Sequence, residues 1–198
     1  MSKSNLKFLY HLAEADNWNS ISINGLLSTS GLIGKADMPE SERHVLLHNH
    51  RPKGVRLPNG VFIRDQAPMP PSALAKALDD NLQPADWYAF LNSFVFFWPD
   101  RNRMDRQRRA CGDRPQIVLT FDATALIDNF GLDLFVSPIN SGNARRKPAR
   151  RGLNTILPYE QWQREGWLRR PRTHPPTEFL FRCPIPAQAP YLLTTSHI

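Results

Sequence analysis

Short runs of apolar and aromatic residues recur along the chain, and most are bounded by proline, glycine or polar residues. This pattern is typical of short, buried strands. The strand-like runs are found at residues 6–12, 94–98, 116–121, 134–136, 178–181 and 191–193. The most apolar of them, Phe94-Val-Phe-Phe-Trp98, predicts a buried strand. The runs 55–57 and 61–63 flank Pro58-Asn-Gly60, which predicts a hairpin.

The predicted helices lie between these runs, and the one at 101–110 is predicted as a polar helix because that segment has no strand pattern. They are found at residues 14–24, 39–48, 71–80, 84–91, 101–110, 123–128 and 158–165. Pro71 and Pro84 stand at the first turn of two of them, the helical position that proline tolerates best. The segment 138–152 has no periodicity and is predicted to be a long loop. Short strands and helices in irregular order predict an α+β domain.

The composition fits one folded domain that spans residues 1–198. The chain is 41% hydrophobic and 22% charged, which excludes wholesale disorder. No apolar run approaches the roughly 20 residues that cross a bilayer, and the N-terminus lacks a signal-peptide core, so we expect a cytoplasmic protein without a membrane partner. Cys111 and Cys183 are too few for a disulfide framework or a Cys-rich metal cluster, and we expect both to be reduced.

Positive charge is concentrated in the middle of the chain. Residues 101–172 hold 15 Lys and Arg against 7 Asp and Glu, a net charge of +8, whereas the whole chain has +7. All but one of these cations are arginines, whose flat guanidinium binds phosphate through two hydrogen bonds. The charge therefore indicates either a polyanionic partner or simply a basic, soluble surface.

Several well-known catalytic motifs are absent from the sequence. It contains no dinucleotide fingerprint, P-loop, zincin motif or nucleophile elbow. His44, His48 and His50 lie close together, and the first two would share one face of a helix, as a pair of metal ligands can. No third ligand is evident nearby, so we predict no metal site, and solvated imidazoles at a helix end are the simpler interpretation.

Three polar residues stand beside predicted buried strands, where a rigid scaffold can hold catalytic groups. His11 lies in the first strand, Arg101 follows the aromatic strand, and Glu178 opens the penultimate one. Each residue alone has an ordinary structural explanation: a satisfied core histidine, a surface arginine, or a charge that protects a strand edge.

Taken in order, the three sites resemble a known family. Phe8-Leu-Tyr-His11, followed by Asn24-Gly-Leu-Leu27, resembles the opening of DarT-type ADP-ribosyltransferases. Phe96-Phe-Trp-Pro-Asp-Arg-Asn-Arg-Met104 resembles the aromatic strand, arginine and methionine of that family. Thr177-Glu-Phe-Leu180 is similar to its C-terminal strand. The segment 34–65 has no counterpart in that pattern.

The resemblance implies the ADP-ribosyltransferase fold, in which two small packed β-sheets with flanking helices hold NAD in the cleft between them. His11, next to Tyr10, would hydrogen-bond the ribose on the nicotinamide side, and Phe97 or Trp98 would stack near the nicotinamide ring. Arg101 would bind the pyrophosphate or stabilise the departing charge. Glu178 would position the ribose 2′-hydroxyl and the acceptor, and act as a base toward it.

In such folds the loop before the catalytic glutamate selects the acceptor, and the segment 138–176 holds that place here. Charge and resemblance together indicate a nucleic acid, DNA or RNA, as acceptor. The candidate nucleic-acid contacts are Arg145, Arg146, Arg150, Arg151, Arg169 and Arg170. Such an enzyme would serve as a toxin or defence effector, and an acidic antitoxin or immunity protein is a further possible partner.

Three alternatives remain open at the level of sequence. The enzyme could modify protein side chains, or it could be an RNA 2′-phosphotransferase that uses NAD to remove a phosphate. The third alternative is a nucleic-acid-binding module without catalytic activity, in which the arginines bind phosphates and Glu178 is structural. That module would bind nucleic acid with an affinity that falls steeply as salt rises, and NAD would not change its stability.

Overall fold

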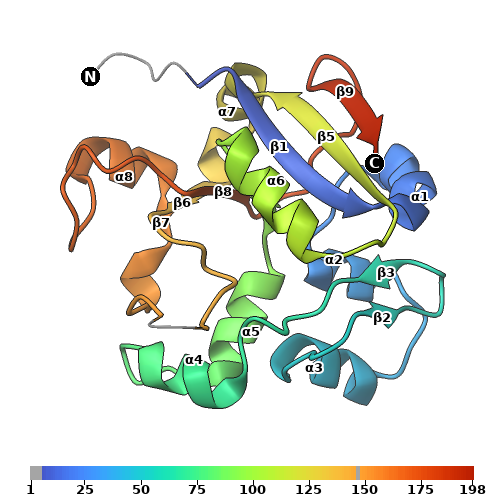
Figure 1. Cartoon of the computed structure of the whole chain (residues 1–198), viewed down its shortest axis with the longest axis horizontal. Helices are drawn as coiled ribbons and strands as arrows, with labels where there is room; N and C mark the ends of the chain where they lie inside the picture. Colours follow the sequence, from blue (N-terminus) through green and yellow to red (C-terminus); the bar gives the residue numbers. More distant parts are fainter. Residues whose placement is uncertain (1–5, 146–147) are drawn as a thin grey trace.

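Two antiparallel β-sheets that meet at one point form the centre of the protein (Figure 1). The computed structural model describes residues 6–145 and 148–198. The first sheet has the strand order β1-β5-β9. Its strands are β1 (Phe8–Glu14), β5 (Gln116–Asp122) and β9 (Leu192–His197). The second sheet has the order β4-β8-β6-β7. Its strands are β4 (Val95–Phe97), β8 (Glu178–Phe181), β6 (Leu134–Ser137) and β7 (Leu157–Pro158).

The two sheets are joined through β1 and the end of β4. The backbone N–H of Tyr10 donates to the carbonyl of Trp98 at 2.9 Å, and the N–H of Trp98 donates back at 2.8 Å. Behind this junction the ring of Phe97 contacts Phe121 of the first sheet and Phe181 of the second, with centroids 5.3 and 5.4 Å apart in edge-on geometry. Because all three rings are fully buried, they tie the sheets together through one aromatic core.

Helices cover the sheets, and their starts follow local capping rules. The Asp100 side chain accepts from the N–H of Arg103 at 3.1 Å, and the Asp122 side chain from that of Ala125 at 2.8 Å, so two helices begin directly after these residues. The helices are α1 (Trp18–Asn24), α2 (Thr29–Gly34), α3 (Glu40–His48), α4 (Pro71–Ala77), α5 (Pro84–Asn92), α6 (Arg101–Ala110), α7 (Ala123–Phe130) and α8 (Tyr159–Glu165). Single 3-10 turns lie at η1 (Ala15–Asn17), η2 (Gly131–Asp133) and η3 (Leu153–Thr155).

The segment 34–65 folds into a small lobe with its own apolar centre. It contains α3, which packs against α5, and the hairpin of β2 (Val55–Arg56) and β3 (Phe62–Ile63), as Figure 1 shows. The buried apolar residues of this lobe are Ala36, Leu57, Val61 and Ile63, which pack together with Ile33 of α2. The lobe is held to α5 by Asn92, whose side chain donates to the carbonyl of Leu47 at 2.7 Å and accepts from Arg51 at 3.0 Å.

The prediction of an α+β architecture is confirmed, and so are the hairpin and the helix at 101–110. The prediction of a helix from residue 14 is wrong, because Glu14 pairs with Gln116 and extends β1, and α1 begins only at Trp18. The helix predicted for 71–80 ends at Ala77, because Leu78 turns away to pair with Arg151. Both differences come from pairing with distant residues, which local propensity does not contain.

The described residues contain no helix that is long and apolar enough to span a membrane. Cys111 and Cys183 are both free and only partly exposed.

Candidate active site

A cavity of about 330 Å³ opens where the two sheets, the lobe 34–65 and α6 come together. This volume lies within the range of about 300–1,000 Å³ that is usual for small-molecule sites. The lining combines apolar residues with polar groups from distant parts of the chain. Among the residues that line it are His11, Arg64, Phe96, Trp98, Asn140 and Glu178.

His11 stands on β1 beside the junction of the sheets and is held as a neutral imidazole. Its burial lowers the pKa to about 4, and the charge of Arg64 acts in the same direction. Nδ1 lies 2.8 Å from the carbonyl oxygen of Phe96. Because a carbonyl can only accept, Nδ1 carries the proton and Nε2 is left as an acceptor. His11 can therefore accept a hydrogen bond from a hydroxyl group of a ligand in the cavity.

Glu178 is the first residue of β8 and is only 2% exposed. Its Oε2 accepts two hydrogen bonds from Ser141, one from the backbone N–H at 3.1 Å and one from the hydroxyl at 2.7 Å. Burial raises the pKa of Glu178 to about 7, against the opposing effects of Ser141, Arg151 and Arg103. A carboxyl group in this state changes its protonation near neutral pH, as a general acid or base does.

Arg151 is a correction to the predicted nucleic-acid contacts. Its side chain is buried at 1% exposure, so it cannot reach a nucleic acid. The guanidinium instead donates to the carbonyls of Ser141 at 2.9 Å, Asn143 at 2.8 Å and Ala149 at 3.1 Å. Buried carbonyls of an irregular loop require such donors, because they have no partner in a sheet. Arg151 thereby holds Ser141, and through it the loop, against Glu178.

Arg101, the predicted partner of His11 and Glu178, is not among the residues that line the cavity. It is exposed at the start of α6, where its guanidinium lies 5.5 Å from the ring centroid of Tyr10 and its Nε lies 3.4 Å from Asp105. The structure thus brings together His11, Trp98 and Glu178 but leaves Arg101 and Tyr10 outside the lining.

Phe97 is a second correction, because it points into the aromatic core and is fully buried. Alternate residues of a strand face opposite sides, so Phe96 and Trp98 face the cavity and Phe97 does not. The prediction that Phe97 or Trp98 stacks against a ligand is therefore narrowed to Trp98.

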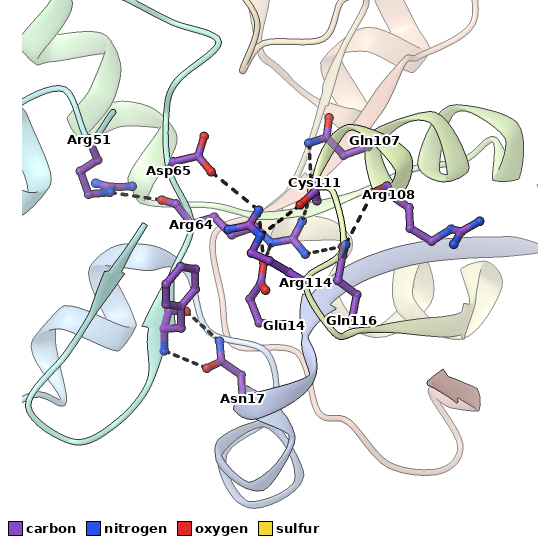
Figure 2. Close-up of polar contacts among 11 residues, drawn as sticks. Glu14, Asn17, Arg51, Arg64, Asp65, Gln107, Arg108, Cys111, Arg114 and Gln116 are labelled. Carbon is purple, nitrogen blue, oxygen red and sulfur yellow. Dashed lines mark hydrogen bonds and ion pairs between the residues drawn. The ribbon is translucent and has the colours of Figure 1, made fainter. Parts of the chain in front are cut away.

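Sequence reasoning missed the arginines that do line the cavity, Arg51, Arg64 and Arg114. Figure 2 shows Arg64 and Arg114 converging on Glu14, with Arg64 Nε 2.8 Å and Arg114 Nη2 3.7 Å from Glu14 Oε1. Arg114 also lies 3.8 Å from Asp65. The missed cations at 51 and 64 belong to the segment for which the resemblance offered no counterpart.

Arg51 is almost fully buried, at 6% exposure, and burial lowers its pKa to about 10. It donates to Asn92 Oδ1 at 3.0 Å and to the carbonyls of Leu46 and Arg64. This arginine therefore connects the lobe 34–65 to α5 at the wall of the cavity.

Most of the other predicted nucleic-acid contacts already have partners within the protein. Arg150 and Arg169 both bind the carboxylate of Asp79, with Arg169 Nη1 3.0 Å from Oδ2. Arg145 is exposed and donates to the carbonyl of Ala67 at 3.0 Å. Arg170 is partly buried beside a small pocket that Asp79 also lines. Arg146 lies outside the described residues.

His44 and His48 stack on the surface of α3 with ring centroids 4.2 Å apart. His50 Nε2 lies 2.9 Å from the carbonyl of Gln66. Over residues 6–145 and 148–198, no group of three or more metal-binding side chains is present.

Glu178→Gln is expected to change how stability depends on pH. The folded state raises the pKa of Glu178 from 4.5 to about 7, so the wild type loses stability as pH rises across this window. The loss corresponds to about 3 kcal/mol at 1.4 kcal/mol per pH unit. His11, whose pKa falls from 6.5 to about 4, contributes the opposite slope in both proteins. The free energy of unfolding of the glutamine variant, relative to wild type, should therefore increase between pH 4.5 and 8.

Urea unfolding at a series of pH values measures this difference. Glu165→Gln serves as the control, because Glu165 is exposed and the neighbouring Arg164 lowers its pKa. The free energy of unfolding of Glu165→Gln, relative to wild type, should change little with pH and should decrease as pH rises. A difference for Glu178→Gln that does not vary with pH would show that the carboxyl is not held in its neutral form.

Comparison with known proteins identifies the family of the chain. None of the curated proteins with which the chain was compared matches it. The model of a family described as "Family of unknown function (DUF7002)" matches residues 7–192, which include β1, the cavity and Glu178. The chain therefore belongs to the DUF7002 family.

Proposed function

We propose that this protein is an NAD-dependent ADP-ribosyltransferase with a nucleic acid as acceptor. The observation that carries the proposal is the meeting of His11 and Glu178 in one cavity at the junction of two sheets. The two residues are 167 positions apart in the chain, and the resemblance assigns both to the same reaction. Trp98, one of the two residues that the resemblance implies as a stacking partner of the nicotinamide ring, lines the same cavity.

The cavity offers groups that suit each part of the co-substrate NAD. His11 Nε2 is an acceptor for a ribose hydroxyl, since Nδ1 is occupied by Phe96. The indole of Trp98 offers a flat face to the nicotinamide ring. Arg64 is a cation at the wall, and it would bind the pyrophosphate while sharing its guanidinium with Glu14, which it contacts at 2.8 Å. In this assignment Arg64 takes the pyrophosphate-binding role that the resemblance implies for Arg101.

The proposed reaction requires an ionised Glu178. The bond between ribose C1′ and the nicotinamide nitrogen breaks, and its electron pair leaves with nicotinamide, which becomes neutral. The positive charge that develops on the ribose is stabilised by the Glu178 carboxylate in a water-poor site. A nucleophile of the acceptor then bonds to C1′, and its proton passes to Glu178 and on to solvent.

NAD is expected to stabilise the wild-type protein against heat. At 100 times its dissociation constant a ligand adds about 2.7 kcal/mol, which corresponds to about 5–10 °C for a chain of this size. The shift should be lost in His11→Phe, which removes the Nε2 acceptor. It should be kept in Arg101→Ala, because Arg101 lies outside the lining. Differential scanning fluorimetry with and without NAD measures these shifts.

Millimolar NAD that leaves the wild-type melting temperature unchanged would remove the main support for the transferase. Labelled NAD then identifies the acceptor class, because transfer to DNA, to RNA and to cell protein can be compared in parallel. Transfer to protein alone, or release of phosphate from a 2′-phosphorylated RNA, would assign the protein to one of the two rival enzyme classes.

A further inference from the structure

We infer that nucleic-acid phosphates bind along the outer face of α6, rather than along the segment 138–176. The inference rests on the proposed function for the identity of the partner, and it names the surface that receives it. The outer face is defined here by Arg103, Arg106 and Arg109, all of which are exposed. It is an interaction surface that the resemblance did not indicate.

α6 has one face that packs inward and helps to line the cavity, and an opposite face that is exposed to solvent. Met104 is fully buried, and Gln107 and Cys111, which follows the last turn, line the cavity. This spacing is the inner stripe of a helix, so the same element that builds the cavity wall presents the opposite side to solvent. In Figure 1 the helix lies on the near side of the molecule, in front of the sheets. Residues 101–110 contain five arginines and one acid, Asp105.

The arginines of α6 differ in whether they already have a charged partner within the protein. Arg101 and Arg108 share Asp105, at 3.4 and 3.7 Å. Arg106 and Arg109 make no ion pair and no side-chain hydrogen bond with the part of the chain that the structure describes. Their charge is therefore available to an anion from outside, at no cost in internal contacts.

The segment 138–176 is a weaker binding surface because part of its positive charge is neutralised within the protein. Arg150 and Arg169 enclose Asp79, whose pKa is lowered chiefly by the hydrogen bond from Arg150. Arg151 is buried under the loop. A phosphate that bound at Arg150 and Arg169 would have to compete with the Asp79 carboxylate, whereas at Arg106 and Arg109 it would not.

The outer face of α6 also leads directly to Glu178. Arg103 Nη1 donates to the Thr177 hydroxyl at 3.2 Å, and Thr177 immediately precedes Glu178. At the start of the helix Arg101 lies over Tyr10, and the ring of Phe8, 41% exposed, is 6.4 Å from that of Tyr10. A strand held by Arg106 and Arg109 that followed the helix back to its start would reach Phe8, an exposed ring on which a base can stack.

Oligonucleotide binding in the absence of NAD tests the surface directly. The probe is a fluorescent single-stranded DNA of about 20 nucleotides, with RNA of the same sequence in parallel. The two variants are Arg106→Gln/Arg109→Gln on α6 and Arg150→Gln/Arg169→Gln in the loop, which remove the same charge. Loss of two phosphate contacts should lower the slope of log affinity against log salt by about 1.4, and affinity at about 50 mM salt by about 10- to 100-fold. The loop variant should bind like the wild type, and all three proteins should melt cooperatively.

The inference is overturned if the Arg150/Arg169 variant loses more oligonucleotide affinity than the α6 variant, or if both variants lose the same affinity. It is also overturned if the wild type does not bind the oligonucleotide. NAD-induced stabilisation, measured on the same proteins, keeps the two proposals apart. If NAD stabilises all three proteins while the α6 variant binds normally, the surface is wrong and the transferase stands. If the α6 variant loses binding while NAD has no effect on any protein, the surface stands without the transferase.

Discussion

Glu178→Gln is expected to lower the rate of ADP-ribosyl transfer by about 10²–10⁴-fold, the range for loss of a positioned acid-base group. The amide keeps the size of the side chain and can still accept from Ser141, so the site should stay assembled. It cannot carry the negative charge that stabilises the cationic ribose, nor take the proton of the acceptor. Initial rates with labelled NAD and an oligonucleotide measure the loss, and stabilisation by NAD should persist in the variant.

The pH profile separates a catalytic from a structural role for Glu178. Because its pKa is raised to about 7, the wild-type rate should rise with pH through this value as the carboxylate forms. The residual rate of the glutamine variant should lack that rise. Glu165→Gln, on the exposed face of α8, should keep the wild-type rate and profile. A glutamine variant that retains half of the activity would rule out the proposed role of the carboxylate.

Arg151→Met is expected to cost about 3–5 kcal/mol of stability, as removal of one partner from a buried charge network does. Three loop carbonyls would lose their donor, and buried polar groups without partners are costly. Glu178 would lose a compensating positive charge, which would raise its pKa further and shift the onset of activity to higher pH.

Urea unfolding at pH 7 measures the cost, with Arg150→Met as the matched control. Arg150 is adjacent in sequence but exposed, and its partner is the carboxylate of Asp79, so its loss should cost about 1 kcal/mol or less. Arg151→Lys should fall between wild type and the methionine variant, because an ammonium cannot serve three spread carbonyls as a guanidinium does. Equal costs for the two methionine variants would contradict the structural role of Arg151.

The sequence by itself determined most of the helices and strands of this protein. The polar segment 101–110, which has no strand pattern, forms α6, where Asp100 caps the helix and Met104 faces inward, and the apolar run at 116–121 lies within β5. These features depend on neighbours within one or two turns or along one strand, which is the range of capping and periodicity. Position beside a buried strand also led to His11 and Glu178, which line one cavity.

Only the tertiary structure decided which arginines are exposed to solvent and which are buried against backbone carbonyls. Arg106 and Arg151 look alike in sequence, since each stands among other arginines in a polar segment. Arg106 is exposed on a helix whose carbonyls are already paired, whereas Arg151 crosses a loop whose carbonyls have no partner in a sheet. Whether a cation is buried depends on backbone groups that distant segments leave unsatisfied, and no local pattern records them.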